Sequence, residues 1–213
     1  MSINEVEVIK FLTFLFDNQC SYNAINTARS ALSTFLWNEN SGLTIGNFPS
    51  VKRFLKGVFE LRPPTPRYDV IWDANVVLDF LSFQYPNEDI PLPFLTCKLV
   101  MLLALSTAQR AQTLQKIYVK NIVFSENLVY IPIIELIKQS KCNNRKFALH
   151  LKPYVKNRAI CVVDTLKEYL KRTKILRGNQ DQLLISFIKP HKAVSRDTIS
   201  RWLKLVLEQV NLC

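Results

Sequence analysis

The feature of this sequence that most limits its fold is a proline-rich stretch about a third of the way along the chain. Residues 62–67 read Arg-Pro-Pro-Thr-Pro-Arg, with three prolines within four positions. Each proline fixes its own φ and removes a backbone donor, so the stretch excludes helix and favours extended polyproline geometry. We therefore predict a linker over residues 62–68, between a small domain at 1–61 and a larger one at 69–213.

The domain before the linker shows only helical patterns. A capping box, Ser2-Ile-Asn-Glu5, opens a first expected helix that carries apolar residues at helical spacing. A second helix is expected over 22–38, and a third directly after Pro49-Ser50. The third helix also carries Lys52, Arg53 and Lys56, which are as compatible with ordinary solvation as with phosphate contact. The first domain is therefore predicted to be a small helical domain.

The domain after the linker mixes helical and strand patterns. Helical spacing recurs at about 74–83, 95–106, 109–117 and 163–173, and again from Ser195, whose hydroxyl can cap the helix. Strand-like texture is found at 118–124, 128–133, 146–151 and 183–187. We therefore predict an α+β protein that is mainly α, with a small antiparallel β-sheet in its second domain.

The excess of positive charge lies entirely in the second half of the chain. Residues 110–213 hold 20 Lys+Arg against 7 Asp+Glu, a net charge of +13, whereas residues 1–109 hold 8 against 10, a net charge of −2. Such a charge excess attracts polyanions, which favours nucleic acid as the partner over a merely solvated basic surface. A membrane surface fits less well, because the basic residues are spread through predicted strands and turns rather than along one amphipathic helix.

Several other classes of protein are disfavoured. The longest apolar run, Leu99–Leu105, is too short to span a bilayer, and residues 1–10 lack the layout of a secretory signal. We therefore expect a soluble intracellular protein with no membrane partner. The five cysteines are scattered and there are only two histidines, so we expect no metal site and no cofactor. The sequence also contains no G-x-S-x-G, Walker-type or H-E-x-x-H motif.

Three segments in a fixed order carry a family resemblance. They are Ala104–Leu114, with the run Leu-Ser-Thr-Ala-Gln-Arg-Ala-Gln-Thr-Leu at its end, then Ile134–Ser140, and Lys189–Trp202. Together they resemble the tyrosine recombinase (phage-integrase-like) family, especially the versions carried by eukaryotic mobile elements. Ala104–Leu114 is similar to that family's first box, T-G-x-R-x-x-E-L, with Ala108 in place of Gly and Thr113 in place of Glu. The resemblance covers residues 95–213 and implies a helical core-binding domain followed by a DNA breaking-rejoining catalytic fold.

The resemblance also implies roles for individual residues. Arg110 matches the family's first catalytic arginine, whose planar guanidinium meets two phosphate oxygens as charge builds on them. Lys138 matches the hairpin lysine that serves as general acid, with Lys141 as the alternative register. A surface arginine and a solvated lysine are the plain alternatives for the two positions. We expect further contacts with DNA from a set of basic and polar residues, namely Lys141, Arg145, Lys146, Lys152, Arg158, Lys192, Ser195, Arg196 and Arg201.

The family's later motifs decide the expected activity. An H-x-x-R box, a second His or Trp and the attacking tyrosine follow the region that matches Val194–Val210 in the family, and the sequence contains none of them there. We therefore expect an incomplete catalytic domain that binds double-stranded DNA without cutting it, in the nucleus or elsewhere in the cell, with self-association on DNA as a further expectation. Two alternatives stay open: an active recombinase whose remaining part lies outside this sequence, and a helical protein-interaction module with a basic surface.

Overall fold

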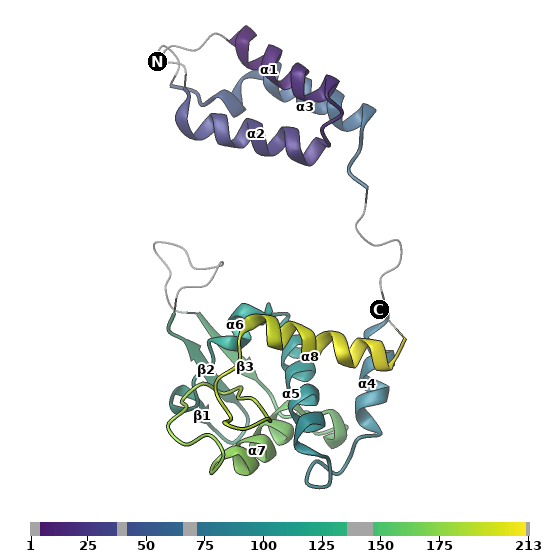
Figure 1. Ribbon diagram of the computed structural model, residues 1–213, viewed down its shortest axis with the longest axis vertical. Helices are drawn as coiled ribbons and strands as arrows, with labels where there is room; N and C mark the ends of the chain where they lie inside the picture. Colours follow the sequence, from purple (N-terminus) through teal and green to yellow (C-terminus); the bar gives the residue numbers. More distant parts are fainter. Residues whose placement is uncertain (1–4, 38–41, 66–71, 136–146, 212–213) are drawn as a thin grey trace. The chain divides into compact units, whose positions relative to one another are not determined.

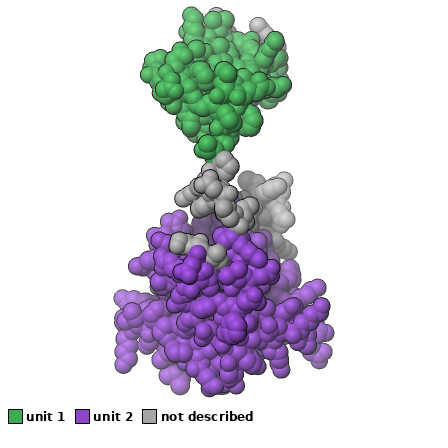
Figure 2. All heavy atoms as spheres, turned by 90° about the vertical axis from the view of Figure 1, so that its right-hand side faces the viewer, with its two compact units in different colours: residues 1–71 green, residues 72–213 purple. Residues whose placement is uncertain are grey.

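A computed structural model describes residues 5–37, 42–65, 72–135 and 147–211. The chain divides into two compact units, Met1–Ile71 and Trp72–Cys213, which Figure 2 colours separately. Each unit has its own hydrophobic core. The fold is α+β and mainly α, with one small antiparallel sheet, as the sequence patterns predict.

Unit 1 is a bundle of three helices, α1 (Glu5–Asp17), α2 (Tyr22–Phe35) and α3 (Pro49–Leu61), with a single 3₁₀ turn at Ile45–Asn47 before α3. Ser21 caps α2 by accepting a hydrogen bond from the backbone N–H of Ala24, and Pro49 occupies the first position of α3, where its missing N–H is not needed. All three expected helices are confirmed. The predicted capping box at Ser2–Glu5 lies mostly outside the described residues.

Unit 2 is built around α5 (Leu92–Thr107), a helix that is buried along most of its length. Helices α7 (Val162–Thr173) and α8 (Arg196–Gln209) pack against it, and α4 (Ala74–Ser82) and the short α6 (Ala111–Gln115) complete the helical part (Figure 1). Within α5, Lys98 is fully buried and its ammonium donates to the carbonyl of Gln84. Burial lowers the pKa of Lys98 to about 8. The buried lysine therefore holds the turn after α4 against the central helix.

The sheet of unit 2 has the strand order β1 (Val123–Phe124), β2 (Val129–Ile133) and β3 (Phe147–Leu151), with both pairs antiparallel. Val129 pairs with Leu151 and Ile133 with Phe147, and alternate residues of β2 are buried. The hydrophobic alternation therefore sets this register, since a slip of one residue would expose the buried set.

One strand prediction is confirmed only at its end, and another is wrong. The strand expected at 118–124 is reduced to Val123–Phe124, because residues 119–121 form a 3₁₀ turn and Tyr118 bridges to Gln182 instead. The strand expected at 183–187 is irregular chain that forms one isolated bridge, Ile185 to Ala193. β-propensity describes a fit to a half-buried pleated surface, and here the neighbouring chain does not supply that surface. In the described part of the chain, no helix is both long and apolar enough to cross a membrane.

Candidate nucleic-acid interface

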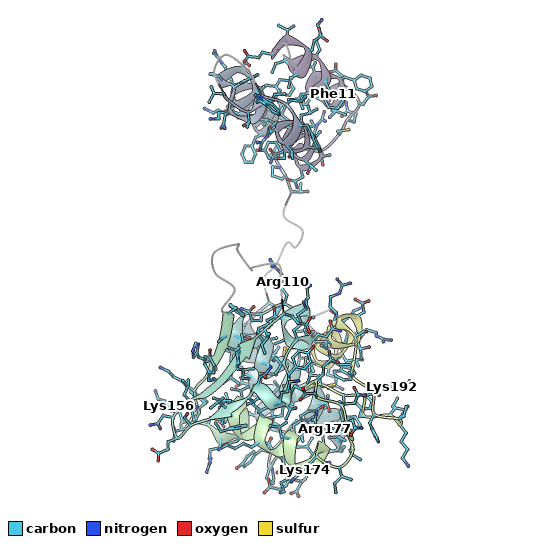
Figure 3. All side chains as sticks on the ribbon, turned by 90° about the vertical axis from the view of Figure 1, so that its left-hand side faces the viewer. Phe11, Arg110, Lys156, Lys174, Arg177 and Lys192 are labelled. Carbon is cyan, nitrogen blue, oxygen red and sulfur yellow. The ribbon has the colours of Figure 1, made fainter. Side chains whose placement is uncertain are left out.

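Arg110 lies on the turn between α5 and α6. The C-cap residue of α5 is Ala108, whose backbone is left-handed (φ 52°), and Arg110 then forms the N-cap position of α6 in extended conformation. The side chain is exposed, and no hydrogen bond or ion pair within the described ranges engages its guanidinium. Figure 3 places Arg110 at one end of unit 2. The turn therefore presents a fixed cation that is available to an anion.

Helix α6 connects this turn to the start of α8. α6 packs against α8, and the side-chain amide of Gln115 donates to the carbonyl of Val194, directly before Ser195 (3.4 Å; Figure 1). Ser195 accepts a hydrogen bond from the backbone N–H of Thr198 (3.2 Å), which confirms it as the N-cap of α8. The turn carrying Arg110 and the N-terminus of α8 are thus joined through one short helix.

A hollow of about 420 Å³ lies beside the N-terminus of α8, and Lys192, Ser195 and Arg201 are among its lining residues. Its apolar side includes Phe187 and Trp202, which stack with ring centroids 5.5 Å apart. Arg201 donates to the Thr198 hydroxyl at 3.2 Å. The structure therefore brings together three of the predicted DNA-binding residues next to the positive end of a helix dipole.

The remaining predicted residues are distributed differently. Arg196 forms an ion pair with its neighbour Asp197 at 3.0 Å. Arg158 pairs with Asp164 at 3.1 Å, and this contact is the main reason that the pKa of Arg158 is raised. Lys152 is exposed directly after β3. In Figure 3, Lys156 and Lys192 lie on opposite flanks of unit 2, with Lys174 at the end away from Arg110. The basic residues that Figure 3 labels therefore lie on several sides of unit 2.

Four predicted residues, Lys138, Lys141, Arg145 and Lys146, lie outside the described residues. Within the described ranges, no three His, Cys, Asp or Glu side chains are grouped so as to hold a metal ion.

Sequence reasoning missed a cluster at the far end of α6. Lys116 lies 3.1 Å from Glu135 across an ion pair, and the Tyr118 hydroxyl donates to the same carboxylate. The Tyr118 hydrogen bond, followed by that of Lys116, lowers the pKa of Glu135, and the same contact raises the pKa of Tyr118. Glu135 lies 17 positions after Tyr118 and farther still from Lys116, so no local sequence pattern predicts the contact.

No family model matches the chain, and no curated protein matches its sequence. Solved structures of similar fold do exist. XerH site-specific recombinase bound to its palindromic difH substrate, in a post-cleavage complex, matches with a TM-score of 0.56 and 16% identity over 99% of this chain and 56% of that one. A lambda integrase dimer bound to a COC' core site matches with a TM-score of 0.53 and 18% identity over 99% of this chain and 64% of that one.

A second lambda integrase structure, bound to DNA, has a TM-score of 0.51 and 17% identity over 99% of this chain and 65% of its own. The chain thus spans between about half and two thirds of the length of these recombinases. At these identities the likeness establishes a shared fold, which agrees with the fold implied by the sequence resemblance.

Proposed function

We propose that this chain binds duplex DNA through unit 2, as a tyrosine-recombinase-like protein. One combined observation carries the proposal. Unit 2 is strongly basic, and the chain has the fold of proteins whose solved structures contain DNA. Unit 2 has 21 Lys+Arg against 11 Asp+Glu, a net charge of +10, whereas unit 1 has 7 against 6, a net charge of +1. A cation excess of this size favours a polyanionic partner through release of the condensed counterions.

Arg110 has a specific part in the proposal. Its guanidinium is exposed and unengaged by the described residues, and the turn between two helices fixes its backbone. A planar guanidinium held in this way can donate hydrogen bonds to two oxygens of one phosphate. We assign Arg110 to phosphate binding at the position of the family's first arginine, with Lys192, Ser195 and Arg201 as a second group of phosphate contacts beside α8.

Strand cleavage is not assigned to these residues, because the sequence contains no H-x-x-R motif. The proposal has further parts. The chain descends from a eukaryotic mobile element, and it associates with itself on DNA. Lys138, in the β2–β3 connection, has a role at the site, and the protein is located in the nucleus.

The test is a titration of duplex DNA binding against salt. A protein that makes about six phosphate contacts loses roughly 10³-fold in affinity between 50 and 200 mM salt. We expect a linear, steep fall of this kind, with similar slopes on unrelated sequences, measured by fluorescence anisotropy of labelled duplexes. A response that stays flat with salt would reject the proposal and favour an acidic protein as the partner.

Single substitutions test which residues form the interface with DNA. Each of Arg110→Ala and Arg201→Ala removes one phosphate contact, so each is expected to reduce the salt slope by about one and the affinity by a few fold. Lys174→Ala removes the same charge at the opposite end of unit 2 from Arg110 (Figure 3) and is expected to leave the slope unchanged. Equal losses in all three variants would mean that only the net charge matters and that no interface has been located.

A further inference from the structure

The carboxylate of Glu135 joins two segments that the backbone does not join. Glu135 follows the last residue of β2 by two positions, and each of its oxygens has its own donor. The Tyr118 hydroxyl donates to Oε1, and the Lys116 ammonium lies 3.1 Å from Oε2. Both donors come from the three residues that follow α6. The cluster is therefore a two-point clamp between the end of β2 and the chain after α6.

Sheet hydrogen bonds do not provide this connection. β1 pairs with β2 only at Val123 and Phe124, so the end of β2 has β3 as its strand neighbour on one side only. The chain at 117–119 makes its backbone hydrogen bonds elsewhere, since the N–H of Val119 donates to Asp181 and the carbonyl of Ile117 accepts from Leu183. In the described part of the chain, no strand hydrogen bonds join the end of β2 to the residues that follow α6. The side chain of Glu135 makes this connection instead.

The clamp leads directly to Arg110. Lys116 is the C-cap residue of α6, and Arg110 is the N-cap residue of the same five-residue helix. The Lys116 side chain is only 18% exposed, so it has little freedom to leave the carboxylate. The clamp thus connects the end of β2 to the helix whose N-cap residue is Arg110.

We propose that Glu135 is a positioning residue that fixes the end of β2 against the helix whose N-cap residue is Arg110. Its importance for DNA rests on the proposed function, because four of the cations expected to contact DNA follow Glu135 in the sequence before β3. The clamp itself does not depend on DNA and can be tested without it.

The direct test is limited proteolysis of the full chain in the absence of DNA. Trypsin cleavage at the lysines and arginines of residues 136–146 is followed by mass spectrometry, which separates it from cleavage elsewhere. We expect Glu135→Ala to accelerate this cleavage at least fivefold. Glu135→Gln, whose amide oxygen can still accept the Tyr118 hydroxyl, is expected to fall between Glu135→Ala and the wild type. The melting temperature should change little, since ion pairs with an exposed partner contribute little to global stability.

Glu208→Ala is the matched control. Glu208 has the same side-chain exposure as Glu135, 45%, and its ion pair with Lys204 lies within α8. We expect its cleavage rate at 136–146 to stay within twofold of the wild type. The proposal is overturned if Glu135→Ala also stays within twofold, or if cleavage within α7 rises by the same factor. In the second case Glu135 would act only on general stability.

A DNA-binding measurement distinguishes failure of this proposal from failure of the proposed function. If the wild type binds duplex DNA with a steep salt slope, Glu135→Ala is expected to weaken binding several fold and to lower the slope, whereas Glu208→Ala is not. If the wild type binds no DNA, the proposed function fails and the proteolysis result alone decides whether Glu135 is a clamp. Unchanged DNA binding by a Glu135→Ala protein with faster cleavage would reject the positioning role and leave only a local contact.

Discussion

Residues near the candidate interface show what a single side chain contributes to it. Ala108 stands where the resembled motif has Gly, and its φ of 52° lies in the left-handed region that a Cβ disfavours. The residue that ends a helix in this conformation is usually Gly for that reason. The sequence therefore differs from the motif only in the side chain at residue 108, because the backbone there has a conformation that suits a glycine.

Ala108→Gly should accordingly stabilise the protein. Relief of the Cβ strain exceeds the extra backbone entropy of Gly in the unfolded chain, and we expect a gain of about 0.5 to 1 kcal/mol in the free energy of unfolding, measured by urea denaturation. Ala104→Gly, within α5, is the control and should lose about 1 kcal/mol. A loss of the same size at both positions would contradict the strain at residue 108.

At the scale of elements, the N-terminus of α8 combines a structural and a proposed binding role in one residue. Ser195 caps the helix through the N–H of Thr198 and also lines the hollow that holds Lys192 and Arg201. The capping role was predictable from the sequence, since a hydroxyl precedes an apolar periodic segment. The hollow was not, because Phe187 reaches it through chain expected to be a strand and found irregular.

Substitutions at Ser195 should separate the two roles. Ser195→Ala removes both the cap and one uncharged phosphate contact, so it is expected to cost about 1 kcal/mol of stability and to weaken DNA binding only slightly. Ser195→Asp keeps a capping acceptor and suits the helix dipole, so its melting temperature should remain near that of the wild type. Its negative charge should nevertheless weaken DNA binding several fold, by repulsion of phosphate. Wild-type affinity in Ser195→Asp would place the DNA elsewhere.

At the scale of the whole molecule, the chain is two units with separate cores. The core of unit 1 is built from its three helices and the turn before α3, and the core of unit 2 surrounds α5. Unit 1 is also the smaller, and small units bury a smaller fraction of their surface. It should therefore be the less stable of the two.

Thermal unfolding should then proceed in two transitions. We expect calorimetry to resolve them, with unit 1 unfolding first. A Trp37→Phe, Trp72→Phe variant retains only Trp202, which is buried in unit 2, so its fluorescence should follow the second transition alone. A single transition with equal calorimetric and van't Hoff enthalpies would show that the units unfold as one.

The sequence by itself determined the helices, the three-proline division, the concentration of charge after residue 109 and the N-cap at Ser195, because each depends on neighbours along the chain. Only the tertiary structure decided the shortening of the strand expected at 118–124, the loss of the one expected at 183–187, the pairing of Arg158 with Asp164, and the contact of Lys116 and Tyr118 with Glu135. The physical reason is that a strand needs an unpaired edge and an ion pair needs an opposite charge nearby, and neighbours of both kinds are supplied by segments distant in the sequence.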